Sequence, residues 1–149
     1  MPASYAAHHL HEAIEILKRI EANSIERIAE LLAAVREGGG RLLFIGVGGG
    51  VERNVSSNLV RALEYAQEMG AKICGIVGRD GGYTARAADA CVVVPVVNPA
   101  TITPHTESFQ ALIWHLLVSH PRLKAAEMKW ESMSSPRNRR ARTPAAAHR

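Results

Sequence analysis

Small and polar residues gather in residues 41–64, RLLFIGVGGGVERNVSSNLVRALE, and their order predicts an anion-binding site. An apolar run leads to a loop and a helical pattern whose candidate ligand-binding residues are Gly48, Gly49, Gly50, Ser56, Ser57 and Asn58. A strand, a glycine-rich turn and a helix N-terminus in series present backbone N–H groups to an anion. The serines and the asparagine are also good N-caps, so capping alone would explain them. The glycines favour anion binding because they let a ligand approach the backbone closely.

This glycine turn does not match the common nucleotide-binding motifs. Counted from Gly46, the dinucleotide fingerprint needs a glycine where Val51 stands, and no acidic residue ends the next apolar run, KICGIV. The Gly-Lys-Ser/Thr of a P-loop is also missing. The turn therefore favours a phosphorylated ligand other than a dinucleotide.

Histidines and a glutamate in the segment TPHTESFQALIWHLLVSH form a third group of distinctive residues, in which His115 is weighed as a catalyst. They are His105, Glu107 and His115, on a predicted helix whose other residues are largely apolar. His115 is therefore expected to be at least partly buried, where a histidine is more often a satisfied core residue than a catalyst. The histidines at positions 8, 9 and 11 are expected on the surface, and the i,i+3 spacing of His8 and His11 is weak evidence for a metal site.

The turn Arg79-Asp80-Gly81-Gly82 follows the run KICGIV. Turn chemistry alone explains these residue types. Ligands of open parallel sheets lie beyond the carboxyl ends of the strands, so Arg79 and Asp80 could also reach one. Both interpretations stay open from the sequence.

The chain pattern alternates between helices and strands. An amphipathic helix is predicted over residues 5–37, kinked near Asn23-Ser24 and ended by Gly38-Gly39-Gly40. Strands are predicted at residues 42–46, 72–77 and 90–94, and further helices at 59–69, 82–88, 106–119 and 123–130. Continuously apolar strands separated by helices indicate a parallel sheet covered on both faces. The predicted fold class is α/β, a three-layer sandwich with a short parallel sheet of about three strands flanked by helices.

Length and composition predict one globular domain in residues 1–133 and a disordered basic tail in residues 134–149. The chain has 149 residues, 47% hydrophobic and 21% charged. The positive net charge of +4 comes from the tail, which has five arginines and no acidic residue. The rest of the chain is nearly neutral, and this distribution does not favour nucleic acid as a partner. The apolar runs are too short to cross a bilayer, and the N-terminus lacks the basic segment and apolar block of a secretory signal. We therefore expect a cytoplasmic protein without membrane contact.

Cys74 and Cys91 lie in strand-like runs and are expected to be buried free thiols.

Together these pieces resemble the sugar isomerase (SIS) domain, and specifically its phosphoheptose isomerase-like branch. The resemblance covers roughly residues 7–121, and its most specific part is NLVRALEYAQEMGAKICGIVGRDGG followed by ADACVVVP. It implies a truncated SIS, flavodoxin-like fold. It also implies that Ser56 receives the sugar phosphate beside Ser57 and Asn58, that Gly48 to Gly50 shape the loop, that Glu107 contacts substrate, and that His115 is the general base.

The chain departs from the family pattern after the first glycine loop. The family places a helix bearing a catalytic glutamate, a strand and another helix between two phosphate loops, whereas here the first loop runs directly into the second helix. This is the pattern of an internal deletion. Glu52 and Glu64 stand nearby, but neither matches the glutamate motif.

The resemblance implies a ketose–aldose isomerase acting on sedoheptulose 7-phosphate through an enediol. The alternative is a non-catalytic sugar-phosphate-binding module that has lost the glutamate. A small core and the family's intersubunit sites predict a homo-oligomer, a dimer or tetramer. No cofactor and no metal site is predicted from the residues; a zinc ion enters only through the resemblance.

Overall fold

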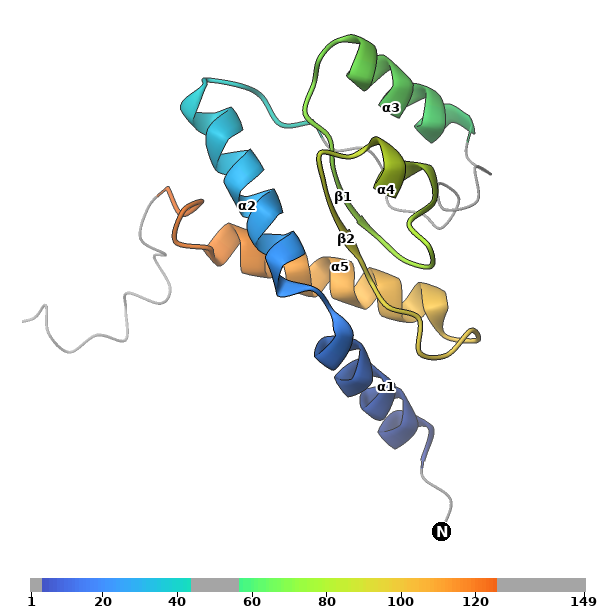
Figure 1. Ribbon diagram of the computed structural model, residues 1–149. Helices are drawn as coiled ribbons and strands as arrows, with labels where there is room; N and C mark the ends of the chain where they lie inside the picture. The colour runs from blue at the N-terminus through green and yellow to red at the C-terminus, as the bar shows by residue number, and fades with distance from the viewer. Residues whose placement is uncertain (1–3, 44–56, 126–149) are drawn as a thin grey trace, which may run out of the picture.

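A computed structural model describes residues 4–43 and 57–125 of the chain (Figure 1). The described elements are α1 (Tyr5–Arg19), α2 (Ala22–Glu37), α3 (Ser57–Glu68), β1 (Cys74–Val77), α4 (Gly82–Ala87), β2 (Ala90–Val93) and α5 (Ile102–Ser119). The alternation of helices and parallel strands confirms the predicted α/β class. Nothing tests the predicted domain limits, because the tail at residues 134–149 lies outside the described residues.

The prediction of one long N-terminal helix is wrong, since two helices meet at Ile20 and Glu21. Ser4 caps α1 by accepting a hydrogen bond from the Ala7 N–H at 3.2 Å. Ile20 then adopts an extended conformation, φ −70° and ψ 134°, three residues before the predicted kink. Ile20 packs against two separate hydrophobic clusters. Because the helix breaks at this residue, α1 and α2 can each bury one face in a different cluster.

Two parallel strands form the sheet in the described part of the chain. Cys74 pairs with Ala90 and Val77 with Val93, and α4 makes the crossover between the strands. Leu42 and Leu43, which open the first predicted strand at residues 42–46, are not in a strand, and residues 44–46 lie outside the described residues. The predicted three-stranded, three-layer arrangement is therefore reduced here to a two-stranded parallel sheet with helices around it.

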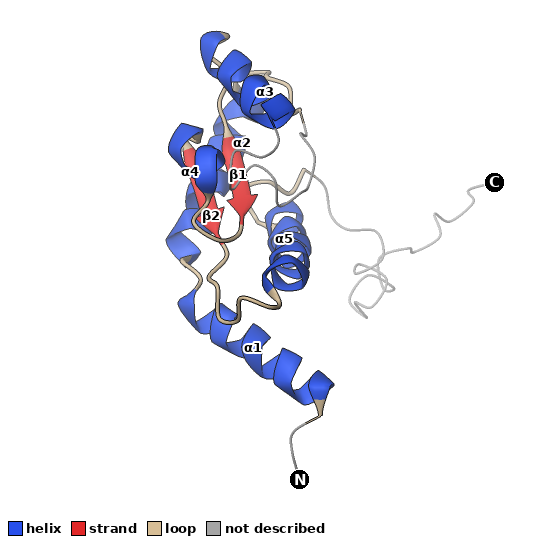
Figure 2. Cartoon of the chain, turned by 90° about the vertical axis from the view of Figure 1, so that its right-hand side faces the viewer, coloured by secondary structure: helices blue, strands red, loops and turns tan. Residues whose placement is uncertain are grey.

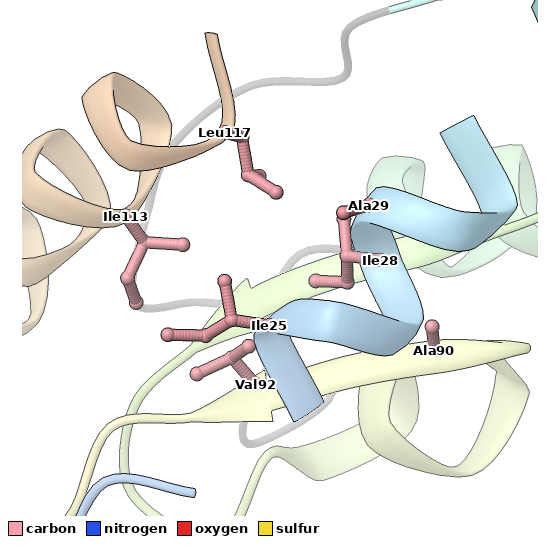
Figure 3. Packing of buried hydrophobic residues seen from close by; sticks show 7 residues of the cluster. All are labelled: Ile25, Ile28, Ala29, Ala90, Val92, Ile113 and Leu117. Carbon is pink, nitrogen blue, oxygen red and sulfur yellow. The ribbon is translucent and has the colours of Figure 1, made fainter. Parts of the chain in front are cut away.

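One face of this sheet carries the main core (Figure 3). Side chains from α2, α5 and β2 form it: Ile25, Ile28, Ala29, Ala90, Val92, Ile113 and Leu117. Residues on the opposite face alternate with these, as a strand requires, and contact α4. A Cβ at Gly75, for example, would stand 2.6 Å from Thr84 Cγ2. Figure 2 shows α4 and α5 on opposite sides of the strands.

The helix α3 lies outside α4 and is held there by a small cluster of its own. Leu63 and Ile73 are its buried members, and Tyr83 of α4 packs against them. On the other side, α5 begins at Ile102, four residues before its predicted start, because Pro104 fits in a first turn, where its missing N–H costs nothing. The helix ends at Ser119, before Pro121, as predicted. The helix predicted over residues 123–130 does not begin at Leu123, which lies in a turn.

A close approach of α5 to the end of β1 depends on Gly78. A Cβ at this position would overlap Oγ1 of the buried Thr106. We expect Gly78→Ala to lower the free energy of unfolding by about 1–3 kcal/mol in urea denaturation, the usual cost of overpacking. Adding Thr106→Ala should recover part of this loss. The matched control is Gly38→Ala, where φ is −76° and the new Cβ makes ordinary contacts, so a change within about 0.5 kcal/mol is expected. Equal effects at Gly78 and Gly38 would contradict the close approach.

Both cysteines are free, as predicted, although they are half-buried rather than fully buried. Cys74 joins the core on the α2–α5 side of the sheet, whereas Cys91 lies on the α4 side, near Gly75. Burial raises the pKa of both thiols, and the pKa of Cys91 reaches about 11, from an ordinary value of 9.0.

We therefore expect Cys91 to be alkylated slowly in the native chain. At pH 8 its reactive thiolate fraction should be about a hundredfold smaller than in the unfolded chain, since the pKa rises by two units. Iodoacetamide labelling with and without urea, followed by peptide mass spectrometry, measures the ratio. Similar rates in the two states would contradict the environment described for this thiol.

Among the described residues, no helix combines the length and apolar character needed to cross a membrane.

Candidate functional site

The predicted phosphate loop is only partly covered by the structure. Gly48, Gly49, Gly50 and Ser56 lie outside the described residues. Ser57 is the first residue of α3 and Asn58 the second, and both are exposed. The part of the prediction that the structure describes is thus the first turn of α3 with two exposed polar side chains, and a helix N-terminus favours anions.

His115 and Glu107 both lie on the exposed side of α5. The prediction that His115 is partly buried is wrong. The buried face of α5 follows the spacing of His105, Phe109, Ile113 and Leu117, and position 115 falls off this stripe. Within the described residues the His115 imidazole has no hydrogen-bond or ion-pair partner, so no described carboxylate orients it.

The described contacts do not bring the two predicted half-sites together. The helix bearing Ser57 and Asn58 packs on α4, while the helix bearing His115 packs on β1 and α2. These helices belong to opposite faces of the sheet (Figure 2). A ligand that contacts both would therefore need residues beyond those described, or a second copy of the chain.

The turn after β1 is accounted for by its own hydrogen bonds. The Gly82 N–H donates to Asp80 Oδ1 at 3.2 Å, and the Gly81 N–H donates to the Gly78 carbonyl at 2.9 Å. Arg79 has a positive φ of 52°, which a residue with a side chain adopts rarely. The turn stands past the carboxyl end of β1, so a ligand-binding role for Arg79 and Asp80 stays a prediction.

A buried polar cluster joins α1 to the segment before α5, and the sequence did not predict it. Its centre is the carboxylate of Glu12, which is 6% exposed. Oε2 lies 2.8 Å from His105 Nε2 and accepts a hydrogen bond from Thr101 Oγ1 at 2.8 Å. Oε1 accepts from Asn98 Nδ2 at 2.5 Å and lies 2.9 Å from His8 Nε2. Every one of these groups stabilises the charged carboxylate.

The electrostatics follow from these contacts. The pKa of Glu12 falls from 4.5 to about 2, chiefly through the hydrogen bond from Asn98 and then through the one with His105, against an opposing effect of burial. Glu12 is therefore ionised at neutral pH. A buried carboxylate is stable only with such compensation, and here it ties α1 to the loop between β2 and α5.

His9 completes the cluster. Its ring stacks on that of His105 with centroids 4.1 Å apart and an interplanar angle of 15°. The prediction that His9 is a surface residue is wrong: it is half-buried, because α1 lies against the segment that carries His105. His8 and His11 are exposed, as predicted, and His8 pairs with Glu12 rather than with His11. The i,i+3 spacing of His9 and Glu12 was the available signal, but His105 stands 93 residues beyond Glu12.

Comparison with known proteins shows which proteins this chain is similar to. It is 38% identical over 64 residues to the phosphoheptose isomerase of Nitratiruptor sp. and 36% identical over 62 residues to that of Rhodospirillum rubrum. These matches cover 43% and 42% of this chain and 32% and 31% of the relatives. The lincomycin biosynthesis protein LmbN of Streptomyces lincolnensis is 31% identical over 120 residues, 79% of this chain and 40% of that protein.

The chain is thus related to phosphoheptose isomerases, as its sequence resemblance implied. It spans less than half the length of these relatives. No protein-family profile and no solved structure matches it.

Proposed function

We propose that this chain is a cytoplasmic sugar-phosphate-binding protein that acts as a ketose–aldose isomerase on sedoheptulose 7-phosphate. The observation that carries the proposal is the relationship to phosphoheptose isomerases, with identities of 33–38%. The position of His115 on an exposed side of α5 supports it, because a general base must reach a bound substrate.

In the proposed mechanism, the start of α3 binds the phosphate. Ser56, Ser57 and Asn58 would offer hydroxyl, amide and backbone N–H donors, and the glycines at positions 48–50 would shape the loop around the phosphate. His115 would move a proton between adjacent carbons of the ring-opened sugar through an enediol. A second group would act as the acid that passes a proton between the two oxygens, and Glu107 would contact the sugar. An imidazole suits this step because its ordinary pKa lies near neutrality.

A homo-oligomer would supply what one copy lacks. Several apolar side chains of α1 and α5 are exposed: Leu10, Ile14, Leu17, Leu112, Trp114, Leu116 and Val118. Burying such faces against a second copy is favourable, and exposed apolar patches of this kind mark association surfaces. A second copy could also bring a phosphate-binding helix and an acid to His115.

The test is incubation with sedoheptulose 7-phosphate and detection of the aldose product. Turnover that increases with enzyme concentration is expected. No turnover, together with stabilisation by the sugar phosphate, would eliminate the isomerase and leave the binding function.

Ser56→Ala should weaken binding of sedoheptulose 7-phosphate, since it removes a donor to the phosphate. A loss of about tenfold is expected from one charge-assisted hydrogen bond, measured by calorimetric titration. Ser119→Ala is the matched control, a serine whose hydroxyl donates within α5 to the His115 carbonyl. Unchanged binding by Ser56→Ala would contradict the assignment of the loop.

The second candidate is a non-catalytic sugar-phosphate-binding module. One observation favours it: within the described residues, no carboxylate pairs with His115, and the family's glutamate motif has no counterpart in the sequence. The turnover assay separates the two candidates, because both predict ligand binding and only one predicts product.

A further inference from the structure

The cluster of His9, Glu12 and His105 has the composition of a transition-metal site. One ligand atom from each residue lies within 4.8 Å of the other two. Two residues come from α1, one turn apart, and the third comes from the first turn of α5, so two helices hold the three donors. Two imidazoles and one carboxylate form a ligand set that Zn²⁺ uses with an open fourth position.

Two of the three donor residues are buried, as ligands of an enclosed metal site are. Glu12 and His105 are 6% and 3% exposed. Thr101 and Asn98 donate hydrogen bonds to that carboxylate and fix its orientation, as outer-shell residues do in metal sites. His8, at 2.9 Å from Oε1, is a further group that faces the carboxylate.

A buried nitrogen with no partner is the independent observation. Nδ1 of His9 is shielded from solvent and makes no hydrogen bond within the described part of the chain. Buried polar atoms normally have partners, so an unsatisfied nitrogen on an imidazole of this cluster calls for a ligand. A cation contributes the missing interaction and balances the carboxylate charge at the same time.

We propose that His9, Glu12 and His105 bind one Zn²⁺ ion. Donor atoms around a tetrahedral Zn²⁺ stand about 3.3 Å apart, from bond lengths of about 2.0–2.1 Å. The 2.8 Å contact between His105 Nε2 and Glu12 Oε2 therefore opens slightly, and the stacked imidazoles tilt so that their lone pairs converge. The proton of the His105 ring then resides on Nδ1. A surface groove lined by His8, Glu12 and Asn98 provides the path of entry.

Zn²⁺ fits this site better than Mg²⁺ or Ca²⁺. The latter two ions prefer sets of oxygen ligands, whereas two of the three donors here are imidazole nitrogens. The ion would fasten α1 to the first turn of α5. This proposal is independent of the proposed isomerase, because none of its residues belongs to the proposed sugar-phosphate site.

Equilibrium dialysis of the full chain against Zn²⁺, without a polyhistidine tag, tests the proposal. One ion per chain is expected, and Co²⁺ in its place should give the strong visible absorption of a tetrahedral site. His9→Ala should weaken binding at least about tenfold. This variant removes no hydrogen bond among the described residues, so circular dichroism should show a native helix content. Saturating Zn²⁺ should also raise the melting temperature of the parent chain by about 5–10 °C.

The matched control is His11→Ala, an exposed histidine of the same helix outside the cluster. It should bind Zn²⁺ and respond to heat like the parent chain. The proposal is overturned if the parent chain binds no Zn²⁺, if His9→Ala binds as tightly as the parent, or if His11→Ala loses binding, which would place the ion on surface histidines.

Discussion

His115→Ala is expected to lower the proposed isomerase turnover by about 10²–10⁴-fold, the usual contribution of a positioned general base. The affinity for sedoheptulose 7-phosphate should change little, because the proposed phosphate contacts come from α3. The fold should also be preserved, since the side chain is exposed and has no hydrogen-bond partner within the described residues. Steady-state kinetics and a calorimetric titration on the same preparation measure the two quantities.

A control histidine separates loss of the base from a general effect of substitution. His11 is exposed on α1, outside the proposed sugar-phosphate site, and His11→Ala should keep full turnover. If His115→Ala also retains its turnover, the base lies elsewhere in the chain. If the variant loses binding and turnover together, His115 holds the substrate rather than moving a proton.

Ile113→Ala should cause the largest loss of stability, about 2–5 kcal/mol in the free energy of unfolding. Ile113 is 0% exposed and belongs to the main core, on the side of α5 that faces α2 (Figure 3). Removing its outer carbons leaves a cavity that the surrounding helices fill only in part. Urea denaturation monitored by circular dichroism gives the value, and the melting temperature should fall by about 5–15 °C.

The neighbouring residue provides the control. Leu112 is 43% exposed on the other side of α5, so Leu112→Ala should change the stability of the monomer by no more than about 0.5 kcal/mol. A loss at Leu112 that depends on protein concentration would indicate that this side of α5 is buried in an oligomer. Equal, concentration-independent losses at both positions would contradict the described burial of α5.

The sequence predicted the elements between residues 57 and 119 well, because their signals are local. Apolar runs bounded by glycine, aspartate and proline located β1, β2 and the end of α5, and the order of helix and strand predicted the parallel pairing. The break at Ile20 had no such signal. Its side chain continues the apolar pattern of a helix, and it leaves the helix because it contacts two clusters made by distant segments.

The surroundings of the candidate site residues also depend on distant segments, so the sequence did not predict them. Apolar neighbours suggested that His115 is buried, but the position of the sheet decides which side of α5 is covered, and that position is not a local property. Glu12 looked like an ordinary polar residue of an amphipathic helix. Its role emerges only when the fold brings Asn98, Thr101 and His105 against α1.

The most direct test of the central proposal is a calorimetric titration of the full chain with sedoheptulose 7-phosphate. We predict saturable binding of one sugar phosphate per chain, competed by inorganic phosphate, because the proposed site at the N-terminus of α3 would recognise the phosphate group. Absence of saturable heat at millimolar ligand, in a sample whose helix content and cooperative unfolding show it to be folded, would contradict the account.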